Sequence, residues 1–356
     1  MENKPAKAPI RGVIYALAAA LLFGMTTPLA KALLEHVAPL MLSSLFYLGA
    51  SMGLGLYLLV GLCSSKTNKG EASLKRADLP WLCGATVCGG ILAPVLLMTG
   101  LAVAPATSAS LFLNLEGVFT ALIAWFVFGE NFDRRIALGF SAIVAGSVLL
   151  SVQFGQTIAI NPGVIPIVAA CLGWAIDNNC TGKIAGSSPA QITCIKGLVA
   201  GLVNLTIALT LHQQLPGSWE LALALVVGCL GYGVSLMLFV LALRHLGTAR
   251  TGAYFAMAPF VSAGLSIVLL HEVITGTILA SGFLMALGLY LHLSESHSHE
   301  HSHKLVEHEH RHVHDLHHNH EHDFEVGKGA HSHWHRHEPV VHDHVHYPDM
   351  HHKHEH

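Results

Sequence analysis

Apolar residues form ten long runs along residues 12–293, and short polar segments separate the runs. A helix needs about 20 residues to cross a bilayer, and lipid offers no partner for an unpaired backbone group, so runs of this length favour helices. The pattern predicts an all-α integral membrane protein with ten transmembrane helices, whose limits are 12–34, 40–63, 80–103, 106–128, 135–153, 162–184, 190–211, 219–243, 248–270 and 274–293. The first run continues well past Ala18, so we expect an uncleaved first span rather than a signal peptide.

Lys and Arg residues concentrate on one side of this predicted helix array. Seventeen of the 19 lie in the N-terminal segment, in alternate loops or in the C-terminal segment, and the other two, Lys31 and Lys196, lie within spans. Because cytoplasmic loops carry an excess of basic residues, the pattern predicts a cytoplasmic N-terminal segment, residues 1–11. Ten spans return the C-terminus to the same side. Lys31 lies in the last turn of its span, where we expect its side chain to extend toward the interface.

The average composition conceals a sharp division of the chain. Overall, 52% of the residues are hydrophobic and 12% are charged, with a mean hydropathy of +0.53, whereas a soluble domain carries about 25% charged residues. Residues 1–294 hold 14 basic and 10 acidic residues, but residues 295–356 hold 5 and 12, together with 23 of the 28 His. We therefore expect an apolar membrane body and a polar tail. The chain contains no P-loop, dinucleotide-binding fingerprint or Ser/His/Asp grouping, so we expect neither an enzyme nor a nucleic-acid-binding protein.

The apolar body contains an internal repeat. The segment LAVAPATSASLFLNLEGVFTALIAWFVFGE, residues 101–130, aligns with LRHLGTARTGAYFAMAPFVSAGLSIVLLHE, residues 243–272, at an offset of 142 residues. Each reads as a helix, a tight turn and a second helix that closes on Glu. Phe23 and Gly24 likewise correspond to Gly173 and Trp174. The halves, 12–153 and 162–293, each hold five spans, and the odd number gives them opposite orientations. Inverted repeats are typical of secondary transporters, whose substrate site lies near the midplane between the halves.

These features resemble the drug/metabolite transporter superfamily, EamA type, which has two tandem five-helix units. The resemblance covers residues 12–293 and rests on the span count, the repeat, and the segments that end in FGE at Glu130 and LHE at Glu272. It implies a ten-helix secondary carrier that exports small metabolites across the cell membrane, here a bacterial inner membrane. Family members often carry a basic residue early in the second helix of each unit. The second unit has Lys196 there, but the first has Phe46, so a substrate rule that needs both basic residues does not carry over.

Three ionisable residues lie well inside predicted spans: Glu116, Asp177 and Lys196. Each costs ~2.5–3.5 kcal/mol near the centre of a membrane helix, so they should face a cavity or one another instead of lipid. Asn178 and Asn179 follow Asp177 directly. Thr181, a fourth polar residue, lies one helical turn after Asp177. This polar cluster is either a substrate or ion site, which we favour, or a set of hydrogen bonds that holds helices together.

The charge balance of these three residues suggests a mechanism. Two acids and one base leave one acid without a protein partner. We therefore hypothesise that Lys196 pairs with Asp177 or Glu116, and that the other acid binds a proton or a cationic group. An amino-acid-like substrate fits the same arrangement, with its carboxylate toward Lys196 and its ammonium group toward the unpaired acid.

The tail, residues 295–356, repeats His at alternate positions. Neutral imidazole binds Zn²⁺, Ni²⁺, Co²⁺ and Cu²⁺, so we expect the tail to bind divalent transition metals through exchanging ligand sets. With few apolar residues and many charges, it should be disordered without a ligand. The predicted ligands are His297, His299, His301, His303, His308, His310, His312, His314, His331, His333, His335 and His337. The seven Cys form no CxxC pair, so they predict neither a zinc site nor a disulfide framework.

Three functions follow from these observations. We favour a proton-coupled exporter of a small organic metabolite, amino-acid-like or drug-like, with a metal-binding cytoplasmic tail. The alternative is an exporter of divalent Ni, Co or Zn with the same fold, and the third is a non-transporting metal sensor or storage protein. The expected partners are the lipid bilayer, a small-molecule substrate, protons and divalent metal ions, and transport requires no cofactor. A homodimer is left open.

Overall fold

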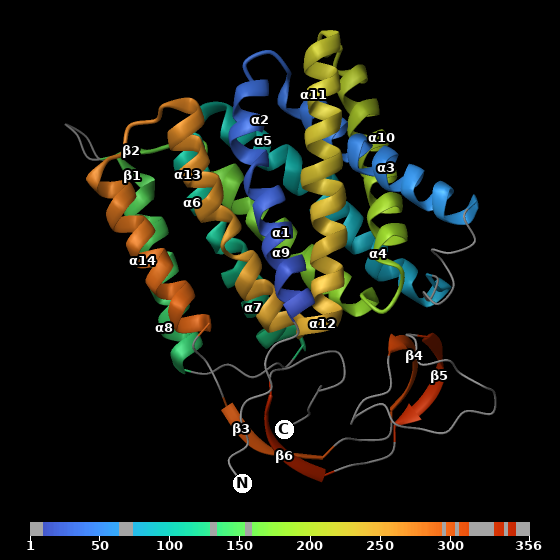
Figure 1. The fold of residues 1–356 in the computed structure, drawn as a ribbon. Coiled ribbons are helices and arrows are strands. Elements are labelled where there is room, and N and C mark those ends of the chain that lie inside the picture. The colour runs from blue at the N-terminus through green and yellow to red at the C-terminus, as the bar shows by residue number, and fades with distance from the viewer. Residues whose placement is uncertain are drawn as a thin grey trace.

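A computed structural model describes residues 10–63, 74–128, 134–153, 159–293, 297–302, 306–312, 331–337 and 341–346. Its main body is a bundle of helices that stand side by side in Figure 1, and the strands of the tail lie below one end of the bundle. Residues 1–9, Glu130, His303 and His314, which the sequence analysis considers, lie outside the described residues.

The first half of the body consists of helices apart from a two-residue β-ladder at its end. Its elements are α1 (Ile10–Gly24), α2 (Thr26–Leu33), α3 (Pro39–Cys63), the 3₁₀-helix η1 (Arg76–Asp78), α4 (Leu79–Ala85), the π-helix η2 (Thr86–Leu92), α5 (Ala93–Val103), α6 (Ala106–Phe112), α7 (Asn114–Phe128), α8 (Arg134–Ser151) and strand β1 (Val152–Gln153). Strand β1 pairs antiparallel with β2 (Ala159–Ile160), which precedes the second half.

The second half repeats this succession of helices. Its elements are α9 (Val164–Ile184), α10 (Pro189–Thr210), α11 (Ser218–Gly228), the π-helix η3 (Cys229–Val234), α12 (Ser235–Phe255), α13 (Ala258–Leu270) and α14 (Gly276–Leu293). The π-helices η2 and η3 lie at the same place in the two halves, about 142 residues apart, so the repeat extends to a local irregularity of the backbone.

Seven helical segments in the described part of the chain are long and apolar enough to cross a membrane. They confirm an all-helical membrane body. Three further apolar helices are shorter, 137–150, 258–270 and 276–291. The predicted span 248–270 is divided because α12 continues to Phe255 and α13 begins beside Pro259, which lacks the N–H that an unbroken helix needs.

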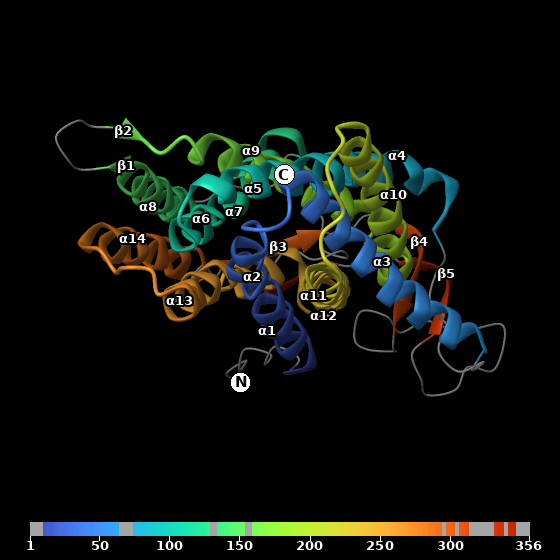
Figure 2. The same ribbon diagram turned by 90° about the horizontal axis from the view of Figure 1, so that it is seen from above.

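The two halves are interleaved. Helix α1 packs on α12, α3 on α10, α9 on α5, α6 on α13, and α8 on α14, so the helices of one half find their main partners in the other. Seen from above in Figure 2, α8 and α14 form one end of the molecule and α3 and α10 the opposite end. The centre of the bundle is therefore an interface between the halves.

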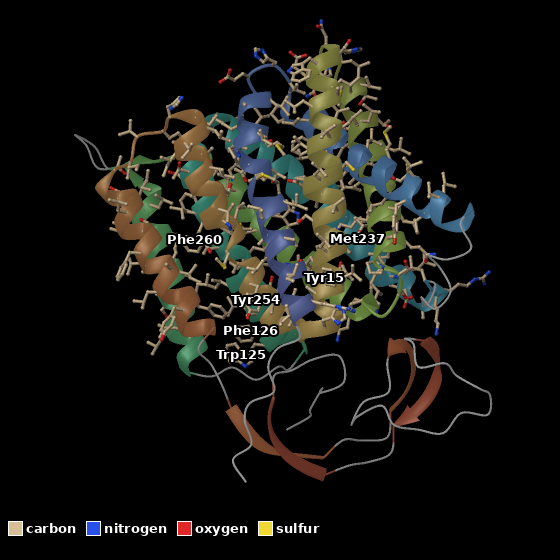
Figure 3. The ribbon with its side chains drawn as sticks, in the orientation of Figure 1. Tyr15, Trp125, Phe126, Met237, Tyr254 and Phe260 are labelled. Atoms are coloured by element: carbon tan, nitrogen blue, oxygen red, sulfur yellow. The ribbon has the colours of Figure 1, made fainter. Side chains whose placement is uncertain are left out.

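Small residues permit the closest of these contacts. A methyl group on Gly228 would collide with the backbone of Phe46, and one on Gly49 would collide with the backbone of Leu225. The outside of the bundle is instead covered with large apolar side chains, such as Phe126 and Phe283, which are 72% and 69% exposed. Figure 3 shows Phe126 and other labelled side chains, among them Trp125 and Phe260, along the side of the bundle that faces the viewer, as expected for a surface that faces lipid tails.

The turn between α5 and α6 is held by charged side chains from both halves. Lys31 donates hydrogen bonds from Nζ to the carbonyls of Leu101 at 2.8 Å and Ala104 at 3.0 Å. Glu272 accepts hydrogen bonds from the backbone N–H groups of Ala106 at 2.7 Å and Thr107 at 2.9 Å. A cation thus satisfies the end of α5 and an anion the start of α6, which is the favourable sign in each case.

The disorder expected of the ligand-free tail stays a prediction. The described parts of the tail are strands β3 (His297–Ser302), β4 (Val306–His312), β5 (His331–His337) and β6 (Val341–His346), in which β3 pairs antiparallel with β6 and β4 with β5. The alternation of His with other residues has the period of two that a strand requires. The register places His at positions directly opposite His, for example His299 opposite His344 and His310 opposite His333.

Candidate functional site

A cavity lies between the two halves, at the crossing of α1, α3, α7, α9, α10 and α12. Its volume is about 40 Å³. The residues around it are Phe23, Tyr47, Glu116, Trp174, Asp177, Asn178, Lys196, Gly231, Tyr232, Ser235, Leu236, Phe239 and Phe255. A buried water needs roughly 10–15 Å³ of such space, so the cavity has room for about three waters. An organic molecule requires a more open arrangement of the helices.

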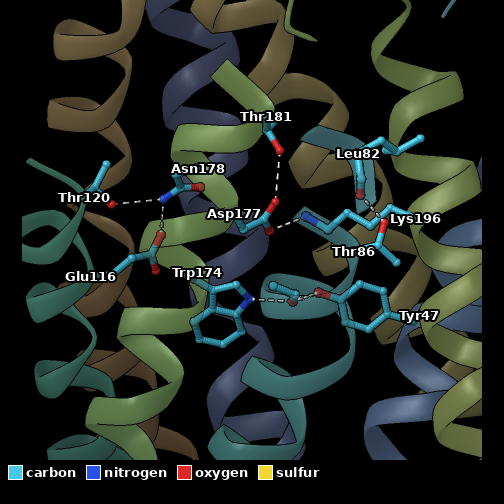
Figure 4. Close-up of polar contacts among 11 residues, drawn as sticks. Tyr47, Leu82, Thr86, Glu116, Thr120, Trp174, Asp177, Asn178, Thr181 and Lys196 are labelled. Carbon is cyan, nitrogen blue, oxygen red and sulfur yellow. Dashed lines mark hydrogen bonds and ion pairs between the residues drawn. The ribbon is translucent and has the colours of Figure 1, made fainter. Parts of the chain in front are cut away.

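Lys196 and Asp177 form a buried ion pair at this cavity. Lys196 extends from α10, and its Nζ contacts Oδ2 of Asp177 on α9 (Figure 4). The two residues are only 2% and 4% exposed. The other carboxylate oxygen of Asp177 accepts a hydrogen bond of 2.9 Å from the hydroxyl of Thr181, one turn further along α9. Of the two acids considered as partners of Lys196, the structure therefore brings Asp177 to it.

Glu116 faces the cavity from α7, outside the ion pair. Its Oε1 accepts a hydrogen bond of 2.7 Å from the amide of Asn178, and the same amide lies 3.5 Å from the hydroxyl of Thr120 (Figure 4). Helices α7 and α9 thus meet through a carboxylate and an amide. Among the described residues, Glu116 accepts a hydrogen bond from Asn178, but no positively charged side chain forms an ion pair with it.

The remaining predicted site residues have other positions. Asn179 donates to the carbonyl of Thr120 at 3.1 Å and to that of Ala175 at 2.9 Å, so it links α9 to α7. Thr181 does not line the cavity itself, but it donates a hydrogen bond to Asp177, which does. Four of the six predicted residues therefore line the cavity: Glu116, Asp177, Asn178 and Lys196. The cluster therefore contains both residues that face the cavity and residues that join neighbouring helices by hydrogen bonds.

The π-helix η2 contributes a backbone carbonyl next to this cluster. The carbonyl of Gly89 accepts hydrogen bonds from the hydroxyl of Tyr47 at 2.6 Å and from Nε1 of Trp174 at 3.1 Å (Figure 4). Gly89 also lies against Asp177, because a methyl group added to it would collide with that carboxylate. A π-helical turn shifts the regular helical bonding, and such turns are frequent at functional sites. Here it lets three helices meet around one glycine.

Replacing Gly89 by Ala is therefore expected to disturb the cavity. The added methyl group must displace Asp177, and overpacking of this kind costs about 1–3 kcal/mol. We expect a lower melting temperature in detergent, measured by fluorescence-detected size-exclusion chromatography. Gly264→Ala on α13 is the matched control, because no neighbouring atom lies within 4 Å of its added methyl group. Equal melting temperatures of the two variants would contradict this view of Gly89.

Aromatic side chains form the largest part of the lining, and the sequence analysis missed their role. Phe23 contacts Trp174, Tyr232 and Phe255, with ring centroids 6.0, 5.8 and 5.4 Å apart. Phe239 contacts Phe255 at 4.8 Å. These residues come from α1, α9, η3 and α12, and nothing in their local patterns distinguishes them from lipid-facing aromatics. The alignment of the halves near Phe23 and Trp174 was the one signal available.

The repeat places the charges in only one of two equivalent positions. Gly89 and Gly231 correspond at the offset of 142, and their added methyl groups would meet Asp177 and Thr26 respectively. Phe46 is the counterpart of Lys196, and it contacts Tyr232 with ring centroids 5.5 Å apart. Lys196 therefore pairs with a carboxylate, whereas its counterpart in the other half packs on an aromatic ring.

Comparisons with known proteins relate this architecture to transport. The EamA-like transporter family matches residues 10–152 and 161–294. The "Uncharacterized transporter" of Methanothermobacter thermautotrophicus is 28% identical over 294 residues, which cover 78% of this chain and 85% of that protein. The "Probable amino-acid metabolite efflux pump" of Salmonella typhimurium is 31% identical over 204 residues, covering 52% and 67%.

The fold itself has a counterpart of known structure. A protein with a determined crystal structure matches with a TM-score of 0.60 and 19% identity, over 80% of this chain and 98% of that one. Both halves of the body fall within the family match. The chain belongs to the EamA-like transporter family.

Proposed function

We propose that this transporter exports a small organic metabolite, amino-acid-like or drug-like, through the cavity between its halves, in exchange for protons that bind Glu116. The observation that carries the proposal is a small cavity at the interface of the two repeats with one carboxylate outside the ion pair. Intramembrane carboxylates of this kind mark substrate and proton pathways. The name of the Salmonella relative supports an amino-acid-like cargo.

The proposed topology has ten spans in two inverted five-helix units, with both termini in the cytoplasm of a bacterial inner membrane. The three shorter apolar helices supply the spans beyond the seven longer ones. The distribution of Lys and Arg supports the orientation.

Export of a divalent metal through the same cavity is less well supported. Of the cavity's two acids, Asp177 is bound to Lys196, and a transition metal favours imidazole or thiolate ligands. In the part of the chain that the structure describes, no three His, Cys, Asp or Glu side chains lie together as a metal site.

We propose that the His-rich tail binds divalent transition metals as a buffer or regulator beside the carrier. The strand register, which sets His opposite His at six positions, supports this role. In this proposal the tail takes no part in the transport step.

Flux measurements in proteoliposomes test both parts. With an imposed proton gradient, we expect gradient-driven flux of labelled amino-acid metabolites by the full chain and by a chain that ends after Glu295. We expect ⁶³Ni²⁺ and ⁶⁵Zn²⁺ to bind the full chain without crossing the membrane. Gradient-driven metal flux would contradict the organic-metabolite proposal, and its loss on truncation would make the tail a delivery segment. Metal binding that survives truncation would contradict the role of the tail.

A further inference from the structure

The formal charges around the cavity leave a net charge of −1. Three lining residues are charged, Glu116, Asp177 and Lys196, and two of them neutralise each other in contact. Lys196 is almost completely buried, so it is not offered to a substrate carboxylate while Asp177 remains bound to it. The remaining charge is the carboxylate of Glu116, which attracts a cation and repels an anion.

Another side of the cavity is aromatic. Tyr232 contacts the rings of Phe23, Phe46 and Tyr47, with centroids 5.8, 5.5 and 5.2 Å apart. Phe239 and Phe255 continue this surface along α12. Faces of aromatic rings attract cations and accommodate apolar groups, so this side favours the body of an amphipathic molecule and can also face its positive group.

An unpartnered hydroxyl lies at the same place. Tyr232 is 5% exposed and lines the cavity, yet its hydroxyl has no hydrogen-bond partner among the described residues. A buried polar group without a partner is costly, and native proteins retain few of them. A polar group of a bound molecule would satisfy it.

We infer that the cargo is an organic cation with an apolar or aromatic body, whose positive group faces Glu116 and whose body packs on Tyr232, Phe239 and Phe255. This inference rests on the proposed function and names its substrate class. An amino-acid derivative whose carboxylate has been removed, amidated or esterified belongs to the class, whereas a free zwitterion or an anion does not. Tyr232 then positions the cargo through its ring and its hydroxyl.

The test compares three probes that share a phenylethyl body but differ in charge: 2-phenylethylammonium, phenylalanine and 3-phenylpropanoate. Binding to the full chain in lipid nanodiscs is measured by isothermal titration calorimetry near neutral pH. We expect the cation to bind at least about tenfold more tightly than the zwitterion, and the anion most weakly. Glu116→Gln should weaken cation binding roughly 30-fold or more, whereas Glu220→Gln, which removes a charge remote from the cavity lining, should not.

Two substitutions separate the contributions of Tyr232. Tyr232→Phe should weaken the cation roughly 2- to 10-fold if the hydroxyl makes a hydrogen bond to the probe or its water, and Tyr232→Leu should weaken it further because the ring is lost. Gradient-driven flux of phenylalanine without a preference for the cation would overturn the inference and leave the proposed function intact. Absence of binding and flux for all three probes, while other amino-acid metabolites cross, would also overturn it. Absence of flux for every organic cargo would instead contradict the proposed function.

Discussion

Proton-driven flux is expected to fall to the level of empty liposomes when Glu116 is replaced by Gln. Glutamine keeps the size of the side chain and can still contact Asn178, but it cannot exchange a proton. Because the other acid at the cavity is bound to Lys196, no second carboxylate is free to replace it. The loss should therefore affect coupling without affecting folding. A pH-sensitive dye inside proteoliposomes reports the expected effect as loss of substrate-induced proton movement.

The surroundings of Glu116 define what this experiment must control. The other titratable groups around the cavity are Tyr47, Asp177, Lys196 and Tyr232. Gln at position 116 leaves all four in place, so a changed pH profile reports the lost carboxyl group. The control variant is Glu220→Gln in the first turn of α11, which should retain wild-type flux. Coupled flux that persists in Glu116→Gln would remove this residue from the mechanism.

The second large effect is expected at the buried ion pair. Lys196→Met leaves the charge of Asp177 buried without its partner, and Asp177→Asn leaves the charge of Lys196 in the same condition. Removal of one member of a buried pair costs about 3–5 kcal/mol, mostly because of the charge that remains. Either single variant should therefore give a low yield of folded protein and a clearly lower melting temperature in detergent.

The double variant distinguishes the ion pair from a general defect in packing. Asp177→Asn combined with Lys196→Met removes both charges, so we expect it to recover much of the stability that each single variant loses. Thr181→Val is a milder comparison, since it removes one hydrogen bond to Asp177 and should cost about 0.5–1.5 kcal/mol. A double variant as unstable as the sum of the single variants would show that the two charges do not stabilise each other.

Much of the architecture follows from the sequence because a bilayer restricts the choices. Long apolar runs must be helices, and the offset of 142 residues between Glu130 and Glu272 is visible in the letters alone. The costs of Glu116, Asp177 and Lys196 in lipid likewise require an interior position, where the structure has them.

The remaining features depend on tertiary contacts that no local pattern encodes. The breaks after Gly24 and Phe255 do not interrupt the apolar runs, so periodicity does not reveal them. Lys31 binds the carbonyl of Leu101, 70 residues further along the chain, and no local pattern reveals this contact. Phe239 resembles a lipid-facing residue until η3 and α12 turn it toward the cavity.

A cryo-electron microscopy map of the full chain with a transported compound bound would locate the cargo relative to the two halves. We expect ligand density between the halves, in contact with Glu116 and with the aromatic surface around Tyr232, in a cavity wider than the present 40 Å³. Ligand density elsewhere, for instance on the lipid-facing side of α14 or against the tail, with the cavity no wider than this, would contradict a substrate site between the halves.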